Sequence, residues 1–322
     1  MSLKISQRTE QMPASAIRKL VPLADAAKAE GVKVYHLNVG APDIKSPDCA
    51  INAVIEKCKT MHHLSYTNSA GFIELRKGLV EKYYKKIGID IDVNEILVEV
   101  AGSEAFACAM QIACDRGDEI IVVEPYYTNY QTFAYLNGIT LKAVPTDIRN
   151  GFDVDDISAF EALVTPKTKA VLLSNPCNPS GKLFTKKEML AIGEFCIKHN
   201  LFLISDEVYR EFCYTDEPHF SAMNIPGCEQ NVILVDSVSK RYNLCGARIG
   251  CIISHNKDVM AAAMKFAQSR LCPPVFGQYA AIGALDTPQS YFDEVKEEYI
   301  RRRDCAVEML NAIPGVYAPT PY

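Results

Sequence analysis

Short apolar runs alternate with amphipathic stretches along most of this 322-residue chain. A run of about four to eight apolar residues predicts a buried strand, and apolar residues spaced three and four apart predict a helix. Strands are expected over residues 95–100, 119–123, 169–174, 201–206 and 231–236. Helices are expected over residues 72–86, 103–114, 185–199 and 289–312. Because strands and helices alternate, the sequence predicts an α/β fold with a mostly parallel central sheet.

Turn-forming residues indicate two boundaries in this fold. The first is a stretch with two prolines over residues 41–47, and the second lies near residues 286–288. Prolines interrupt helices and strands, so such stretches connect elements. We expect an N-terminal arm and the start of a small domain over residues 1–45, and a large domain over 46–287. An interdomain helix and the beginning of a C-terminal small domain are expected over 288–322.

The composition is typical of a globular enzyme. Hydrophobic residues make up 48% of the chain and charged residues 23%, enough for one large core and a smaller domain. The formal net charge of −5 provides no basic face for nucleic acid. No apolar run approaches the roughly 18 residues of a membrane span, and the polar N-terminus shows no targeting segment. We therefore expect a cytoplasmic protein without nucleic-acid or membrane partners.

Cysteines and histidines show no metal-ligand spacing. The twelve cysteines are scattered without a CxxC pair, so we expect reduced and mostly buried thiols and no metal site. Neither a Walker loop nor a Gly-x-Gly-x-x-Gly motif occurs, so nucleotide binding has no support.

The strongest chemical signal follows the strand predicted over residues 231–236. Lys240 lies three residues after Ser237 and eight before Arg248. A lysine amine forms an imine with an aldehyde, while a hydroxyl and a guanidinium bind phosphate. The segment therefore suggests a pyridoxal phosphate site. Taken alone, a lysine at a strand end is usually an ordinary solvated side chain.

Two further strands end in polar side chains at the same predicted edge of the sheet. One ends at Asp206 and is followed by Tyr209, and another runs into the proline-rich turn that contains Asn178. Open α/β sheets bind ligands at the carboxyl ends of their strands. Asp206 could pair with a protonated pyridine nitrogen, and Tyr209 could donate to a phenolate. Taken singly, the alternatives are a helix cap, a packing residue and a purely structural turn.

Together these motifs resemble the fold type I, class I/II aminotransferases, near the aspartate aminotransferases. The similarity covers about residues 37–319. Its most specific pieces are NPCNPSG over residues 175–181, SDEVY over 205–209, and SVSK over 237–240 with Arg248 eight residues later. These motifs follow one another in the family's order, which makes coincidence a poor explanation.

The resemblance implies pyridoxal phosphate as the cofactor, bound by the large domain. It makes Lys240 the Schiff-base lysine and Asp206 the partner of the pyridinium nitrogen. Tyr209 and Asn178 would donate to the ring phenolate, and Asn178 would also lie near the substrate. The catalytic residues implied are Lys240, Asp206 and Tyr209.

The resemblance also implies a phosphate site. Ser237 and Arg248 would hold the phosphate together with the start of the helix after the first strand, which contains Gly102, Ser103 and Glu104. The free amide groups and the dipole of a helix N-terminus favour an anion at this place.

Three more positions match the family's pattern. Tyr127 aligns with the aromatic residue that stacks on the pyridine ring, often a tryptophan in relatives, whereas this chain has no Trp. Tyr66 begins a Tyr-x-x-x-x-Gly motif whose tyrosine reaches the phosphate of the neighbouring subunit, which implies a homodimer with composite sites. Gly40 matches a glycine whose backbone lies near the substrate carboxylate, where close approach requires a missing side chain.

The sequence departs from the family in two places. Gly246-Ala247 precedes Arg248 where many relatives have Gly-Trp or Asn-Glu. Relatives also continue for several tens of residues and carry there the arginine that clamps the substrate α-carboxylate. We therefore expect a truncated chain. If the 322 residues were the whole protein, cofactor binding could survive, while transamination would be in doubt. Arg270 could read a side-chain carboxylate, although an interface or surface role is favoured.

The implied activity is transfer of an amino group from an L-amino acid to a 2-oxo acid, with Lys240 as the base. Aspartate and glutamate come first as substrates, followed by aromatic or alanine-type donors. A carbon–sulfur β-lyase on the same fold would share Lys240, Asp206 and Arg248. A cofactor-binding regulatory module would need an N-terminal DNA-binding domain, and the region before the large-domain motifs shows no helix-turn-helix signal.

Overall fold

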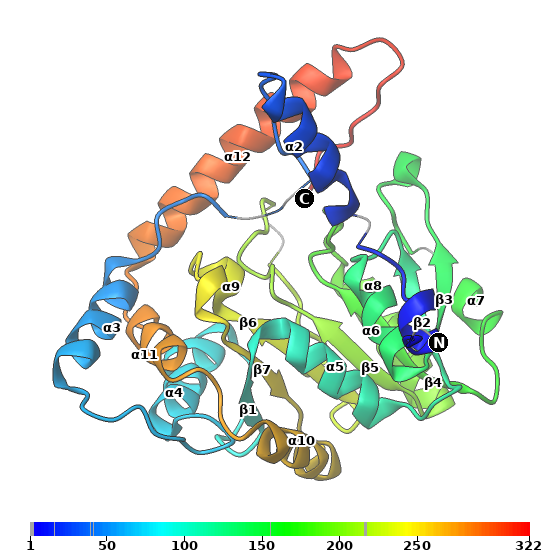
Figure 1. Cartoon of the computed structure of the whole chain (residues 1–322). Coiled ribbons are helices and arrows are strands. Elements are labelled where there is room, and N and C mark those ends of the chain that lie inside the picture. Colours follow the sequence, from blue (N-terminus) through cyan, green and yellow to red (C-terminus); the bar gives the residue numbers. More distant parts are fainter. Residues whose placement is uncertain (1–2, 16, 39, 41, 155, 216–217) are drawn as a thin grey trace.

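The central element of the fold is a seven-stranded sheet (Figure 1). The structure is a computed structural model that describes residues 3–15, 17–38, 40, 42–154, 156–215 and 218–322. In these residues the strand order is β1-β7-β6-β5-β4-β2-β3. The strands are β1 (Ile96–Glu99), β2 (Glu119–Glu124), β3 (Thr140–Pro145), β4 (Thr168–Ser174), β5 (Phe202–Asp206), β6 (Val232–Ser237) and β7 (Gly250–Ile253).

The predicted mostly parallel sheet is confirmed. The five strands β3, β2, β4, β5 and β6 run parallel, while β7 is antiparallel to both β1 and β6. Parallel neighbours require crossover connections, and helices supply them. The strands β3 and β7 are additional to those predicted from the apolar runs.

Helices connect the strands and surround the sheet (Figure 1). The α-helices are α1 (Gln7–Gln11), α2 (Val21–Ala29), α3 (Asp48–Thr60), α4 (Ile73–Gly78), α5 (Ala101–Ala113), α6 (Asn129–Asn137), α7 (Ser158–Glu161), α8 (Lys186–His199), α9 (Val238–Arg241), α10 (Lys257–Arg270), α11 (Val275–Ala284) and α12 (Gln289–Asn311). The predicted helix over 72–86 is a composite, because α4 continues as the π-helix η2 (Leu79–Tyr83) and the 3₁₀-helix η3 (Tyr84–Ile87).

Local signals explain where two of these helices begin. A capping box starts α8: Thr185 Oγ1 accepts from the backbone of Glu188 at 3.2 Å, and the Glu188 carboxylate accepts from the backbone of Thr185 at 2.7 Å. Helix α5 begins two residues before its predicted start. Its first residues lie directly against β7, because a Cβ on Gly250 would stand 2.5 Å from the carbonyl carbon of Ala101. Glycine at position 250 thus lets two backbones meet.

Both faces of the sheet are buried. On β2, Ile121 and Val123 belong to one apolar core, whereas Ile120 and Val122 belong to a second core on the other face. This alternation follows the period of two along a strand, and burial of both faces is typical of a parallel sheet. All twelve cysteines are free as predicted, although five rather than most of them are fully buried.

The long helix α12 follows α11 and stands clear of the central sheet (Figure 1). Val295 is the one residue of α12 that is fully buried. All seven strands lie within the predicted large domain of residues 46–287, and α12 begins at Gln289. The division into domains itself stays a prediction. Among the described residues, no helix is long and apolar enough to cross a membrane.

Candidate active site

The carboxyl ends of β4, β5 and β6 meet at one edge of the sheet. The backbone N–H of Asn175, directly after β4, donates to the carbonyl of Asp206 at 2.8 Å. The backbone N–H of Glu207, directly after β5, donates to the carbonyl of Val235 at 3.0 Å. These bonds bring the three predicted strand ends together at the edge where such sheets bind ligands.

Lys240 lies in a cavity of about 330 Å³ at this edge. The short helix α9 carries it, and its Nζ donates to the carbonyl of Gly40 at 3.0 Å. Asn178 and Tyr209 line the same cavity, and the Tyr209 ring centroid is 5.6 Å from the lysine Nζ. Four of the predicted site residues, from widely separated segments, therefore share one cavity.

The cavity also has an aromatic wall that sequence reasoning missed. Phe212, Tyr214 and Tyr299 line it, and the rings of Tyr209, Phe212 and Tyr299 follow one another at centroid distances of 6.0 and 5.4 Å. Tyr299 comes from α12, far from the motifs in the sequence. Its spacing in the sequence is that of an ordinary helix residue, so the sequence does not indicate that it lines a cavity.

Asp206 is buried, with 4% of its surface exposed, and accepts only neutral hydrogen bonds. The Tyr130 hydroxyl donates to its Oδ2, and the backbone N–H of Val208 donates to its Oδ1 at 3.2 Å. Burial raises the pKa of Asp206 to about 7, against the opposing effect of the Tyr130 hydrogen bond. No cation of the described residues forms an ion pair with this carboxylate.

Tyr127 lies near Asp206. Burial raises the pKa of Tyr127, and the Asp206 charge raises it further, while the charge of Arg248 lowers it. The Tyr127 hydroxyl accepts from Asn129 Nδ2 at 2.7 Å. Tyr130 joins the predicted stacking residue to the predicted acid, because its ring meets Tyr127 and its hydroxyl donates to Asp206.

The predicted phosphate ligands form hydrogen bonds within their own chain. The Ser237 hydroxyl accepts from the backbone of Ser239 at 3.0 Å, which caps α9, and donates to the carbonyl of Ile249 at 3.1 Å. Arg248 has a left-handed backbone with φ of 53° and donates to the carbonyl of Cys245 at 3.1 Å. Their role at a phosphate stays a prediction.

Gly102, Ser103 and Glu104 lie in the first turn of α5, although the side chain of Glu104 does not suit a phosphate. Its carboxylate accepts from the backbone of Val100 at 2.6 Å and pairs with Arg270 Nε at 3.0 Å. The negative charge of the Glu104 carboxylate would also repel an anion such as a phosphate. The prediction for this helix start concerns its free backbone amides and stays a prediction, while the Glu104 carboxylate is engaged within the chain.

Arg270 is committed to its own chain. Its guanidinium lies 3.2 Å from Glu99 and 3.0 Å from Glu104, and 13% of its side chain is exposed. Burial raises the pKa of Glu99 to about 8, with Glu104 adding to the increase. The interface or surface role stays a prediction, and within the subunit the guanidinium contacts the carboxyl groups of Glu99 and Glu104.

Tyr66 and Gly40 are the two remaining predicted site residues, and their roles stay predictions. Tyr66 is 79% exposed and lines a second cavity of about 680 Å³, whose lining shares no residue with that of the Lys240 cavity. Gly40 does line the Lys240 cavity, but a Cβ at this glycine would meet no atom within 4 Å. Contacts within the chain therefore do not require a glycine there.

Comparisons with known proteins agree on one family. The model of the family "Aminotransferase class I and II" matches residues 32–321. The chain belongs to the class I and II aminotransferases. It is a pyridoxal phosphate-dependent aminotransferase, as the order of its motifs predicted.

Curated and solved relatives of this aminotransferase carry similar names. It is 33% identical over 315 residues to the aspartate aminotransferase of Pyrococcus abyssi, covering 96% of this chain and 79% of that one. The aspartate aminotransferase structure from Rhizobium meliloti matches with a TM-score of 0.93 and 29% identity, covering 99% and 80% of the two chains. An alanine aminotransferase from Pyrococcus furiosus matches with a TM-score of 0.90 and 32% identity, covering 99% and 82%.

The residues of this aminotransferase fit pyridoxal phosphate. The buried Asp206 carboxylate has no cationic partner among the described residues, which is the environment that a protonated pyridine nitrogen would complete. Lys240 is a primary amine in the adjoining cavity, and the first turn of α5 provides unpaired backbone donors. Acid, amine and anion site are the three groups that this cofactor requires.

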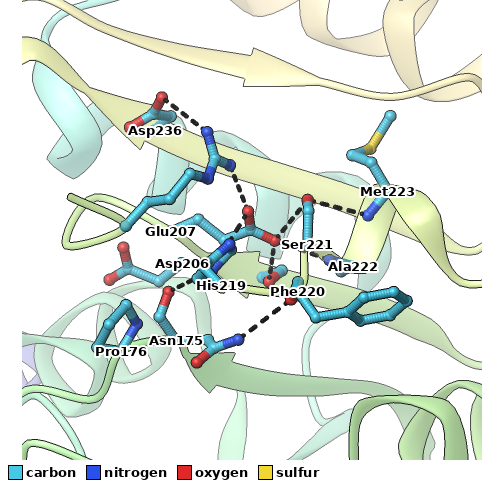
Figure 2. A network of polar contacts seen from close by, with 12 residues as sticks. Asn175, Pro176, Asp206, Glu207, His219, Phe220, Ser221, Ala222, Met223 and Asp236 are labelled. Carbon is cyan, nitrogen blue, oxygen red and sulfur yellow. Dashed lines mark hydrogen bonds and ion pairs between the residues drawn. The ribbon is translucent and has the colours of Figure 1, made fainter. Parts of the chain in front are cut away.

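Behind the site, this aminotransferase contains a buried network of paired charges (Figure 2). Glu207 accepts from Ser221 Oγ at 3.0 Å and from the backbone of Ala222 at 2.9 Å, and it pairs with Arg210. Although burial opposes it, Arg210 holds the pKa of Glu207 below its ordinary value. The network ties a distant loop to the strand end next to Asp206.

A second pair in this network lies beside Lys240. Arg241 Nη2 contacts Asp236 Oδ2, which also accepts from the Tyr84 hydroxyl at 2.6 Å, and the Arg241 guanidinium lies 3.5 Å from the Tyr83 ring centroid. All of these groups are buried. The helix that carries Lys240 is thus fixed through its next residue.

Proposed function

We propose that this aminotransferase transfers the amino group of aspartate or glutamate to a 2-oxo acid. The observation that carries the proposal is the cavity that joins Lys240, Asn178 and Tyr209, together with the buried Asp206 carboxylate three residues before Tyr209, which accepts only neutral hydrogen bonds. Several curated relatives are named aspartate aminotransferases, which supports these two donors. A cytoplasmic location stays part of the proposal.

The protein's own residues would hold the cofactor in a fixed orientation. Asp206 would accept a hydrogen bond from the ring nitrogen, and Tyr209 and Asn178 would donate to the ring oxygen. Ser237, Arg248 and the backbone amides of residues 102–104 would bind the phosphate, and Tyr127 would lie against the ring. When bound, pyridoxal phosphate supplies an aldehyde for amines and a ring that accepts negative charge from the substrate α-carbon.

Lys240 would move the proton. Its side chain lines the cavity, and its Nζ donates to the carbonyl of Gly40. From there the amine, when unprotonated, would remove the proton from the substrate α-carbon and give it up again in a later step. Burial keeps Tyr209 protonated, because it raises the pKa of this phenol, so Tyr209 remains a donor.

We further propose that the protein is a homodimer in which Tyr66 of each subunit completes the partner's site. Tyr66 lies outside the Lys240 cavity of its own chain, and helices α3 and α11 and the segments next to Tyr66 and Arg270 carry several exposed apolar side chains. These are Ile51, Ile55, Leu64, Leu271 and Phe276. Exposed apolar residues of this kind are typical of an interface between subunits.

A second class of donors is favoured by the aromatic wall. Phe212, Tyr214 and Tyr299 offer apolar faces, whereas no arginine lines the described cavity. Such a surface suits an aromatic amino acid better than a second carboxylate. The proposal therefore places phenylalanine and tyrosine directly after aspartate and glutamate.

The test is spectroscopic. Purified protein is loaded with pyridoxal phosphate, and aspartate, glutamate, alanine and phenylalanine are added separately. Loss of the visible absorbance with a donor, and its return with a 2-oxo acid, is the expected result, and the rates rank the donors. Release of pyruvate and ammonia from cystathionine, without reversal by a 2-oxo acid, would instead establish the carbon–sulfur lyase.

The subunit arrangement is tested with mixed dimers. Tyr66→Ala and Lys240→Ala are each expected to impair the enzyme. In a hybrid of the two, the one site that retains Lys240 receives Tyr66 from the other subunit, so mixing the variants should restore one site per dimer. A monomer by sedimentation, or no gain on mixing, would contradict composite sites.

A further inference from the structure

Tyr130 connects two predicted parts of the cofactor site. It lies in the first turn of α6 and is 1% exposed. Its hydroxyl donates to Oδ2 of Asp206, and its ring meets Tyr127 edge-on at a centroid distance of 5.4 Å. Phe106 holds the ring from another side at 5.1 Å. One side chain thus touches both the buried acid and the residue expected to lie against the cofactor ring.

Tyr130 forms the most important hydrogen bond to the Asp206 carboxylate. The charged groups with the largest effect on Asp206 are Asp236 on β6 and Glu207 directly after β5, and both are negative. The remaining hydrogen bond to its carboxylate comes from the backbone of Val208. Among the described residues, Tyr130 is the one side chain that donates to it.

Tyr130 remains a donor over the working pH range. Burial, with the Asp206 charge second, raises the pKa of the Tyr130 phenol well above its ordinary value. The phenol therefore stays protonated, and its proton points at a carboxylate. A hydrogen bond to a charged group stabilises the ionised form more than the neutral one.

We propose that Tyr130 is a positioning residue that keeps the Asp206 carboxylate ionised and directed at the ring-nitrogen side of the cofactor site. Its hydroxyl fixes Oδ2, the Val208 amide fixes Oδ1, and its ring sets the place of Tyr127. The protein thereby orients acid and ring platform relative to each other before any ligand enters. The inference rests on the proposed role of Asp206.

Tyr130→Phe tests this by removing one hydroxyl. The Asp206 pKa, followed in ligand-free protein by carboxyl infrared difference spectra against Asp206→Asn, is expected to rise by about one unit, because a charged hydrogen bond is lost. The affinity for pyridoxal phosphate near pH 7 is expected to fall about tenfold. Tyr135→Phe is the matched control, since Tyr135 lies on the same helix and donates to the carbonyl of Arg8 at the surface. An unchanged Asp206 pKa would overturn the proposal.

A double variant separates positioning from packing. If Tyr130 acts through Asp206, Tyr130→Phe should change cofactor affinity less than about twofold in an Asp206→Asn background. Equal losses in both backgrounds would assign Tyr130 a packing role only. The ligand-free titration decides the proposal even if the wild type fails to bind pyridoxal phosphate, an outcome that would contradict the proposed function instead.

A second substitution covers the case in which Tyr130→Phe does not fold. 3-Fluorotyrosine in place of Tyr130 nearly keeps the shape of the side chain and is a more acidic donor. It should lower the Asp206 pKa, the opposite sign to Tyr130→Phe. An unchanged or raised pKa would again overturn the proposal.

Discussion

Asp206 and Glu207 are adjacent in the sequence and equally buried, yet their environments are opposite. Glu207 faces Arg210 and accepts hydrogen bonds from Ser205, Ser221 and Ala222, so its charge is compensated. Asp206 accepts hydrogen bonds from neutral donors only, the Tyr130 hydroxyl and the Val208 backbone N–H. A buried charge with an ion-pair partner is compensated within the fold, whereas a buried charge without such a partner is suited to binding a ligand of opposite charge.

Lys240→Ala should give the largest effect on the cavity side. Removing the amine is expected to lower the rate of transamination by at least about 10⁴-fold, because no other described side chain in the cavity is a primary amine. Stability should hardly change, since the side chain forms one hydrogen bond across the cavity. Stopped-flow spectra and thermal unfolding measure the two. Turnover within tenfold of wild type would contradict the role of Lys240.

Asp206→Asn is expected to make the ligand-free protein more stable at neutral pH. A carboxyl with a raised folded-state pKa stabilises the fold below its unfolded pKa of about 4, and this contribution is lost as the pH rises through about 7. Relative to the variant, wild type should therefore lose on the order of 4 kcal/mol between pH 4 and pH 8. Urea unfolding at both pH values measures this difference. If the free energy of unfolding changed equally with pH in the two proteins, burial would not destabilise the ionised form of Asp206.

Arg241→Met should show the reverse behaviour on the network side. It leaves Asp236 buried without its nearest cation, so the free energy of unfolding should fall by about 3 kcal/mol. The matched control is Arg301→Met, which removes an exposed pair with Glu298 and should change stability by less than about 0.5 kcal/mol. Equal effects from the two substitutions would remove the distinction between the buried network and the surface.

Phe212→Ala should give the smallest effect and should concern the choice of substrate. Loss of this ring from the cavity wall is expected to lower kcat/KM for phenylalanine about tenfold, with little change for aspartate. Steady-state kinetics with both donors checks this. A similar loss for both would mean that Phe212 supports the cavity without contacting the substrate side chain.

The paired and unpaired charges also differ in how well the sequence predicts them. Asp206 and Lys240 stand at strand ends inside short motifs, and periodicity locates those ends to within one or two residues. Tyr130 lies in a helix at a position typical of a core residue, and only its hydroxyl indicates a polar contact. The contact between Tyr84 and Asp236 joins residues 152 positions apart, and nothing local in either segment indicates it.

The fold followed from the sequence more completely than the site. Alternating runs of apolar residues suffice for a parallel sheet, because burial of both faces imposes them on every central strand. The start of α5, by contrast, depends on Gly250 and Ala101 meeting from different elements. The pairing of Glu104 with Arg270 likewise arises from packing, and nothing local in the sequence indicates it.

Tyr299 makes one wall of the Lys240 cavity easier to displace than the others. The lining residues that follow strands of the sheet are Asn178, Tyr209, Phe212, Tyr214 and Lys240. Tyr299 is instead carried by α12, a helix of 23 residues in which Val295 alone is fully buried. Segments with few buried contacts open at low free energy. Displacing α12 would draw Tyr299 away from Phe212, so the entrance to the amine can widen and narrow while the sheet that holds Asp206 stays rigid.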